Sequence, residues 1–265
     1  MKFRAKAQRW KERRKDNCLR LSFHLCAFAR NYFPTICGLI FLCTCISSAQ
    51  ANTRVTISMP ISGEIRVDAE LSSPTRSWSF RNAYAGVLGM AERIGDFRAT
   101  DAAGQDARVK KLAAGEFRSE LDATKITYTV KLSEPRAAGI PHVSWLADDR
   151  GFLMFADLIP QDIETLSAEF KLPTGWTVES SIVSDSNARY TVSESQKAVF
   201  LVGRSLRKTS TGLNLDVVLS GVWPFKEAEA SKVASSVLQK YLDLTGFKLP
   251  DKTAVMIAPS PIADG

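Results

Sequence analysis

Apolar and polar residues alternate along most of the chain between Val55 and Leu219. Clear examples are residues 65–71, 126–132, 166–170 and 213–219. A period of two is typical of β-strands that bury one face and leave the other in water. Short turn sequences separate these runs, among them Ser62-Gly63, Ala114-Gly115 and Ser210-Thr-Gly212. Many short strands joined by frequent turns predict an antiparallel β-sandwich.

Residues 84–94 depart from this alternation. The apolar residues here that follow a helical spacing are Val87, Leu88, Ala91 and Ile94. This spacing predicts a short helix or a helical loop. Two glycines, Gly86 and Gly89, weaken the helix, because glycine loses more backbone entropy on folding than other residues.

A stronger helical pattern follows Trp223-Pro224. Residues 225–244 are rich in Ala, Glu, Lys and Leu, and their apolar stripe consists of Val233, Val237, Leu238, Tyr241 and Leu242. Proline suits a helix start and glycine the position after a helix end, so Pro224 and Gly246 mark the two ends. Residues 252–258 then predict a fully apolar strand.

Taken in order, these patterns predict a mainly β protein. We expect an antiparallel β-sandwich, followed by one α-helix and the first strand of an incomplete α/β or α+β domain. The predicted boundaries are 1–51 for a signal peptide, 52–222 for the sandwich and 223–265 for the helix and strand. The strand at 252–258 needs sheet neighbours that this interpretation does not find in the chain, which favours a truncated gene product or half of a split protein.

Residues 1–51 have the three regions of an export signal. Ten Lys or Arg residues precede an apolar run at 36–46, and Ala49-Gln50-Ala51 forms a small-x-small cleavage site. The apolar run is shorter than the roughly 20 residues that span a bilayer. We therefore expect cleavage after Ala51 and a periplasmic or extracellular protein that is not held in the membrane. An uncleaved anchor or a buried helix is the alternative.

Removal of residues 1–51 changes the composition. The formal net charge of +7 divides into +8 in this segment (10 minus 2) and −1 in the rest (25 minus 26). The basic character of the whole chain therefore gives no reason to expect a nucleic-acid partner. All five cysteines also leave with the segment. The mature chain then has no disulfide and depends on its hydrophobic core for stability.

His142 is the only histidine after this segment. A zinc site of the His-Glu-x-x-His type needs two histidines, so the mature chain has no such site. Ser144 shares a face with His142 if the segment is a strand, and the pair Asp148-Asp149 is near in sequence. A hydrolase that uses His142 and Ser144 is therefore one hypothesis. No Gly-x-Ser-x-Gly motif supports it, and a structural role for this low-ranking polar site is the more common case.

Other cofactor chemistry has no motif in the chain. Asp148, Asp149 and Asp157 lack the spacing of an EF-hand, and no Gly-x-Gly-x-x-Gly or Gly-Lys-Ser/Thr phosphate loop occurs. We therefore assign no catalytic residue, no metal ligand and no cofactor. The spread tryptophans are more typical of a sandwich core than of a ligand platform. Trp223-Pro224-Phe225, at the predicted boundary, is the best candidate for a domain-interface contact.

Several short motifs belong together. They are Trp78-Ser-Phe-Arg-Asn-Ala-Tyr-Ala-Gly-Val, Ile94-Gly-Asp-Phe97 through Asp101-Ala-Ala-Gly104, Ile126-Thr-Tyr-Thr-Val130, Phe170-Lys-Leu-Pro-Thr-Gly-Trp176 and Gly246-Phe-Lys-Leu-Pro250. Together they resemble the N-terminal β-domain of the glycyl aminopeptidase family of zinc metallopeptidases. The resemblance covers most of residues 55–260. It departs from the family where the usual Pro-Gly-Ser-Tyr is replaced by Ser79-Phe-Arg-Asn-Ala-Tyr84.

The resemblance implies a β-domain that packs on a thermolysin-like catalytic domain and helps to wall its substrate cleft. The family's His-Glu-x-x-His helix would lie beyond Gly265, so no catalytic or metal-binding residue is transferred, and zinc would belong to that missing domain. The implied partners are such a catalytic domain or a peptide substrate. We expect the non-catalytic N-terminal domain of an exported aminopeptidase-like metallopeptidase in a truncated form. The alternative is a self-contained periplasmic or surface module that binds a peptide, a protein or a glycan.

Overall fold

The computed structural model describes residues 52–61, 63–84, 86–132, 143–247, 249 and 252–259. All of them belong to one unit, Ser48–Gly265. The predicted signal segment and its cleavage site, as well as His142, lie outside the described residues. Within the described part of the chain, we find no helix with the length and apolar character needed to cross a membrane.

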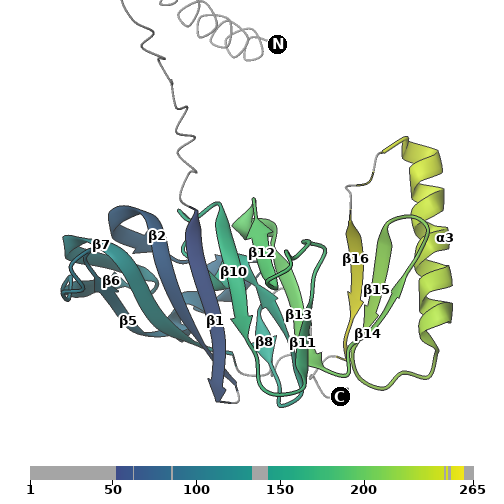
Figure 1. Ribbon diagram of the computed structural model, residues 1–265, viewed down its shortest axis with the longest axis horizontal. Helices are drawn as coiled ribbons and strands as arrows, with labels where there is room; N and C mark the ends of the chain where they lie inside the picture. The colour runs from purple at the N-terminus through teal and green to yellow at the C-terminus, as the bar shows by residue number, and fades with distance from the viewer. Residues whose placement is uncertain are drawn as a thin grey trace, which may run out of the picture. The chain divides into compact units, whose positions relative to one another are not determined.

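The largest sheet has seven strands in the order β12-β10-β1-β2-β7-β5, with β6 paired to β7 (Figure 1). Their bounds are β1 (Thr53–Ile61), β2 (Glu64–Ser79), β5 (Ile94–Thr100), β6 (Val109–Ala113), β7 (Glu116–Lys131), β10 (Leu166–Lys171) and β12 (Arg189–Val192). Neighbours are antiparallel except for β1 and β10, which are parallel. The sheet is therefore mixed, where the sequence predicted only antiparallel pairs.

A second sheet has four antiparallel strands in the order β11-β13-β9-β8. Its elements and the short helices beside it are β8 (Trp145–Leu146), β9 (Arg150–Met154), α2 (Phe155–Leu158), β11 (Trp176–Glu179), η2 (Ser195–Lys197) and β13 (Val199–Arg204). We call β1 to β13 the sandwich.

The sandwich has one continuous core between the two sheets. Val55 and Ile57 of β1 and Ile65 and Val67 of β2 alternate with polar outward residues and are fully buried. They belong to the same cluster of buried side chains as Phe200 from the second sheet. At one end of the core, aromatic rings meet with centroids 4.3 to 6.0 Å apart, from Trp78, Phe80, Phe97, Phe117 and Tyr128. The predicted mainly β fold is confirmed.

Residues 83–93 differ from the sequence prediction. Where a short helix or a helical loop was predicted, the chain first forms a small hairpin of β3 (Ala83–Tyr84) and β4 (Val87–Leu88) and is helical at the 3-10 helix η1 (Met90–Arg93). Gly86 and Gly89 have positive φ angles of 85° and 73°. This left-handed conformation ends any regular helix and suits glycine, so the turn requirement overrides the apolar spacing.

The last part of the chain forms a separate sheet, which we call the C-terminal unit. Its elements are β14 (Arg207–Ser210), β15 (Leu215–Leu219), α3 (Glu227–Thr245) and β16 (Thr253–Ile257). The strand order is β14-β15-β16, and β16 runs parallel to β15 (Figure 1). The chain therefore does encode one sheet neighbour for the strand at 252–258, because β15 supplies it. The predicted boundary at residue 223 falls between β15 and β16 and stays a prediction.

Helix α3 ends as its sequence predicts. Gly246 has a φ of 64°, and its N–H donates to the Leu242 carbonyl at 2.8 Å. The helix packs on the sheet through a narrow stripe of Ala230, Ala234 and Leu238, which contact the buried residues of β15. The predicted single stripe was therefore wrong in part. Leu238 turns inward, while Val233, Val237 and Tyr241 are between 52% and 66% exposed.

Candidate functional site

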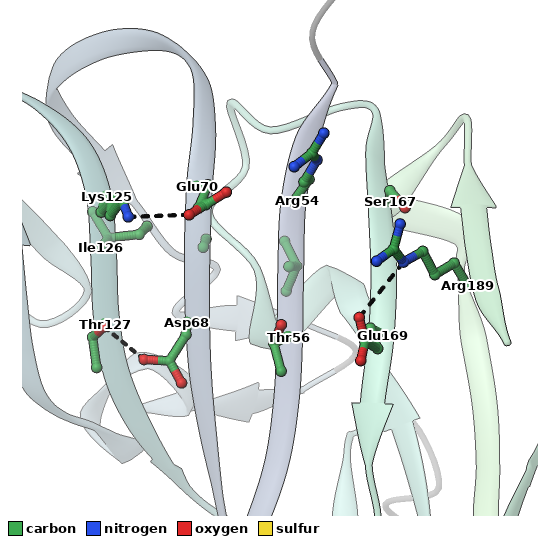
Figure 2. Close-up of a pocket in the computed structure, with 12 residues that line it drawn as sticks. Arg54, Thr56, Asp68, Glu70, Lys125, Ile126, Thr127, Ser167, Glu169 and Arg189 are labelled. Atoms are coloured by element: carbon green, nitrogen blue, oxygen red, sulfur yellow. Dashed lines mark hydrogen bonds and ion pairs between the residues drawn. The ribbon is translucent and has the colours of Figure 1, made fainter. Parts of the chain in front are cut away.

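A hollow of about 410 Å³ lies on the outer face of the seven-stranded sheet (Figure 2). Five neighbouring strands supply its walls: β7, β2, β1, β10 and β12. Its polar lining side chains occupy the outward positions of these strands, and the core residues Val55, Ala69 and Ile126 contribute to its floor. The labelled members are Arg54, Thr56, Asp68, Glu70, Lys125, Ile126, Thr127, Ser167, Glu169 and Arg189.

The strand register arranges these side chains in rows across the sheet. Thr56 lies opposite both Asp68 and Glu169, and Asp68 lies opposite Thr127. One step along the strands, Arg54 lies opposite Glu70, which lies opposite Lys125. Residues directly opposite on one face of a sheet interact. The hollow therefore contains two rows of polar groups: charge alternates along Lys125, Glu70 and Arg54, whereas the other row places Asp68 and Glu169 on either side of Thr56.

Most charged groups in the hollow are paired. Lys125 Nζ lies 3.1 Å from Glu70 Oε1, and Arg189 Nε lies 3.6 Å from Glu169 Oε2 (Figure 2). The Thr127 hydroxyl donates to Asp68 Oδ1 at 2.8 Å. These side chains are roughly half exposed, and each such surface pair contributes on the order of 0 to 1 kcal/mol. The pairs therefore fix side-chain positions more than they stabilise the fold.

Arg54 differs from the other cations of the hollow. Its guanidinium has no hydrogen bond or ion pair with any described residue, although its side chain lies in the wall between Glu70 and Ser167 (Figure 2). A guanidinium offers five donors in a planar fork that suits a carboxylate. Arg54 is thus available to an incoming acceptor group.

The polar groups that line the hollow are hydroxyls and charged side chains. The hydroxyls of the hollow belong to Thr56, Thr127 and Ser167, and no histidine lines it to act as their base. Among the described residues, no group of three or more His, Cys, Asp or Glu side chains is placed to hold a metal ion. What the hollow offers is a set of fixed donors and acceptors for a polar or zwitterionic group.

Ser144, half of the predicted low-ranking polar site, lies in a buried network centred on Asp157. The Ser144 hydroxyl donates to Asp157 Oδ1 at 2.6 Å, and its backbone N–H donates to Oδ2 at 2.9 Å. Arg93 Nη2 donates to the same Oδ2 at 2.7 Å. Asp157 is 3% exposed and Ser144 1% exposed. Because Ser144 and Arg93 of η1 both donate to Asp157 of α2, this buried serine helps to hold η1 and α2 together, which is a structural role. Its predicted partner, His142, lies outside the described residues.

Trp223 and Phe225, two of the predicted domain-interface residues, pack within the C-terminal unit. Their rings stack with centroids 5.3 Å apart, and both contact the buried residues of β15. The Trp223 indole N–H donates to the Ser220 carbonyl at 2.7 Å. Pro224 between them is exposed. The role of these three residues at a domain interface stays a prediction.

The same unit exposes much apolar surface. Of the twelve large apolar residues that are exposed in the described chain, seven lie between residues 222 and 255. Four of these follow one face of α3: Val233, Val237, Tyr241 and Leu244. Contiguous exposed apolar patches on soluble proteins commonly mark an interaction surface. We call these four residues the α3 stripe.

A solved structure of an aminopeptidase N family protein has a similar fold. The aminopeptidase N family protein from Idiomarina loihiensis matches with a TM-score of 0.63 at 14% identity, over 80% of this chain and 44% of that one. The M1 zinc metallopeptidase from Deinococcus radiodurans matches with a TM-score of 0.46 at 11% identity, over 80% of this chain and 56% of that one. No protein-family model and no curated protein matches the sequence.

The chain therefore has the fold of a β-domain of the aminopeptidase N type. The resemblance that its short motifs predicted is confirmed at the level of the fold. The chain spans less than half the length of the Idiomarina protein.

Two parts of the site were not found from the sequence. Most hollow residues are polar positions of alternating strands, and such positions in most sheets only face water. The alternation also does not show the order of the strands, so it cannot show that these five strands lie side by side. Arg93 and Asp157 are 64 residues apart. The signal for Asp157 is its position next to Ala156 and Leu158 in an otherwise apolar stretch, where a lone carboxylate needs a partner.

Proposed function

We propose that this chain is a non-catalytic β-domain of an exported aminopeptidase-like metallopeptidase. The sandwich gives the domain its rigid body, and the C-terminal unit packs against a catalytic zinc domain. Zinc and the reacting groups belong to that partner domain, and the sandwich helps to wall the cleft for a peptide substrate. In this proposal the exported chain begins after Ala51 and lacks the zinc site.

The observation that carries this proposal is the concentration of exposed apolar residues in the C-terminal unit. A helix that packs on one side of a sheet is stable in a layered structure only when the apolar residues on the helix's outer face are also covered. Val237 and Leu244, at 66% and 74% exposure, have no such cover from the described residues. The fold likeness to an aminopeptidase N family protein supports a peptidase domain as the cover.

Zinc analysis and an activity assay test the proposal together. The purified chain should contain far less than one zinc ion per molecule by elemental analysis, and it should not hydrolyse aminoacyl-anilide substrates. The result that overturns the proposal is one tightly bound zinc per chain that is lost to a chelator together with hydrolytic activity. A separate measurement tests whether the chain is exported and cleaved. Mass spectrometry of the periplasmic protein should give an N-terminus at Asn52, and a full-length chain retained in the cytoplasm contradicts it.

The unpaired Arg54 favours a second candidate function, a module that binds a peptide through its terminal carboxylate. The test is a calorimetric titration with short unblocked peptides and with the same peptides amidated at the C-terminus. Binding that is lost on amidation and in Arg54→Gln, but not in the matched surface variant Arg98→Gln, supports this candidate. Equal binding of both peptide forms excludes it.

A further inference from the structure

Polar side chains that lack a partner gather on one half of the hollow. The polar groups of β2 and β7 are paired with one another. On β1 and β10, by contrast, Arg54, Thr56 and Ser167 form no side-chain hydrogen bond or ion pair with any residue that the structure describes. Glu169 of β10 lies 3.6 Å from Arg189, which is an ion pair but is too long for a hydrogen bond. The Glu169 carboxylate can therefore still accept from a ligand.

These four side chains form two pairs across the parallel strands β1 and β10. The strand register sets Arg54 beside Ser167 and Thr56 beside Glu169. The two pairs are two residues apart along the strands, which corresponds to about 6 to 7 Å. Figure 2 shows Arg54 and Ser167 nearer one end of the strands, with Thr56 and Glu169 further along. We call Arg54 and Ser167 the donor pair, and Thr56 and Glu169 the acceptor pair.

Each pair suits a different group. A guanidinium donates through a planar fork that matches the two oxygens of a carboxylate, and a serine hydroxyl adds a further donor. The donor pair therefore suits a carboxylate. An ammonium group has three donors and forms its strongest hydrogen bonds with an ionised carboxylate. The acceptor pair, a carboxylate beside a hydroxyl, suits such a group. A ligand that satisfies both pairs is negative at one end and positive at the other.

The charge of the whole hollow favours a zwitterion over an anion. Three cationic and three anionic side chains line it, and their formal charges cancel: Arg54, Lys125 and Arg189 against Asp68, Glu70 and Glu169. A phosphate or a dicarboxylate would bring additional negative charge close to Glu70 or Glu169, and like charges at short range repel. A ligand without net charge avoids this repulsion when each of its ends meets the matching pair.

The separation of the two pairs sets the length of the ligand. A free amino acid carries its ammonium and carboxylate on one carbon, so it reaches only one pair. Two extended residues span at most about 7 Å, which matches the separation of the pairs. The volume of the hollow, about 410 Å³, also lies in the range of small-ligand sites. A dipeptide with two free ends is thus the shortest peptide that reaches both pairs.

We propose that the hollow binds an unblocked dipeptide. Its C-terminal carboxylate lies at the donor pair, and its N-terminal ammonium lies at the acceptor pair. The proposal rests on the second candidate function, in which a peptide carboxylate binds Arg54, and it adds the second contact and the length of the ligand. All walls of the site belong to strands of the sandwich.

Calorimetric titration of the full chain tests the proposal. The protein is kept reduced, because five cysteines lie in its first 45 residues. The probes are Ala-Ala, N-acetylated Ala-Ala, Ala-Ala amide and free alanine, each added up to about 10 mM. Ala-Ala should bind, and the three other probes should bind about tenfold more weakly or less, because each lacks one terminal charge or the length to reach both pairs.

Two variants locate the contacts. Arg54→Gln and Glu169→Gln should each weaken Ala-Ala binding about tenfold or more. Arg54→Gln should also lose the distinction between Ala-Ala and its amide, and Glu169→Gln the distinction between Ala-Ala and its acetylated form. Glu120→Gln is the matched control, since it removes an exposed carboxylate that is paired with Arg108 at 3.4 Å outside the hollow. It should bind Ala-Ala like the wild type, and the circular dichroism of all three variants should match the wild type.

The outcomes separate this proposal from the candidate function on which it rests. Equal binding of Ala-Ala and its acetylated form, with much weaker binding of the amide, overturns the dipeptide assignment and leaves the carboxylate contact at Arg54 in place. Free alanine that binds as tightly as Ala-Ala also overturns the assignment, as does an equal loss in Glu120→Gln and Glu169→Gln. Equal binding of acid and amide, or no binding of any probe, overturns both.

Discussion

The sandwich and the C-terminal unit are both apolar β-structures, but they bury their apolar residues to different degrees. In the sandwich, thirty buried residues form one cluster between two sheets. The corresponding cluster in the C-terminal unit has three, Leu215, Val217 and Leu219, under a single helix. Two facing layers cover one another, whereas one helix covers only part of a sheet. The first region thus buries its apolar residues within itself, whereas the second leaves apolar residues exposed that a partner could cover.

The largest expected effect is in the sandwich core. Phe200 is 0% exposed and contacts the rings of Phe155, Phe170 and Tyr190. Phe200→Ala should lower the free energy of unfolding by about 3 to 5 kcal/mol, because it leaves a cavity that the packed rings cannot fill. Urea denaturation measures the change. In the matched variant Val237→Ala, on the α3 stripe, the change should be within about 0.5 kcal/mol. An equal loss in both variants would mean that the stripe is covered in solution.

The next effect concerns the buried Asp157 network. Asp157→Ala removes the carboxylate, itself 2% exposed, that accepts from the Arg93 guanidinium and the Ser144 hydroxyl. We expect a loss of about 3 kcal/mol by the same denaturation measurement. The exposed pair of Arg76 and Asp122 is the control, with Nε and Oδ1 2.8 Å apart. Asp122→Ala should change stability little, since water replaces the lost partner. A small effect of Asp157→Ala contradicts the clamping role of this network.

A smaller effect is expected where the two regions meet. Asp216 of β15 accepts from the Ser210 hydroxyl at 2.6 Å and lies 3.2 Å from Lys208 Nζ, which also reaches Glu179 of the sandwich at 3.1 Å. Burial alone raises the pKa of Asp216, but the Ser210 hydrogen bond and the two lysines outweigh it, so this pKa lies below its ordinary value. Because Lys208 is one-third exposed, Asp216→Asn should cost only about 1 to 2 kcal/mol.

The stability that Asp216 contributes depends on pH with a definite sign. A carboxyl whose pKa is lower in the folded than in the unfolded state adds stability above its unfolded pKa and loses it as pH falls through the folded pKa. The difference between wild type and Asp216→Asn should thus be full at neutral pH and should shrink below the ordinary value of 3.8. Denaturation curves between neutral and acidic pH measure it. A difference that grows toward acid contradicts the assignment.

Sequence patterns predicted what depends on local periodicity. The alternation at 65–71 and 126–132 became β2 and β7, and the helix at 225–244 became α3, ended by Gly246 as expected. Pairing between distant segments was not predicted. The parallel contacts of β1 with β10 and of β15 with β16 depend on the tertiary path of the chain.

The errors have physical causes as well. The helical spacing at 84–94 did not give one regular helix, because Gly86 and Gly89 adopt left-handed backbone conformations. The apolar stripe predicted from Val233, Val237, Leu238, Tyr241 and Leu242 divides between the sheet and solvent, because periodicity shows which residues share a side but not which of them the sheet can reach. The hollow was not found, since outward polar residues look alike whether they face water or a ligand.

Hydrogen–deuterium exchange compares the two regions most directly. With dilute chain, amides of β1, β2, β7 and β13 should exchange slowly and together, near the limit set by global unfolding, whereas those of α3 and β16 should exchange much faster through local opening. This result is predicted if the sandwich is complete and the C-terminal unit lacks a partner. Protection of α3 and β16 equal to that of the sandwich, in a chain shown to be monomeric, would contradict the account.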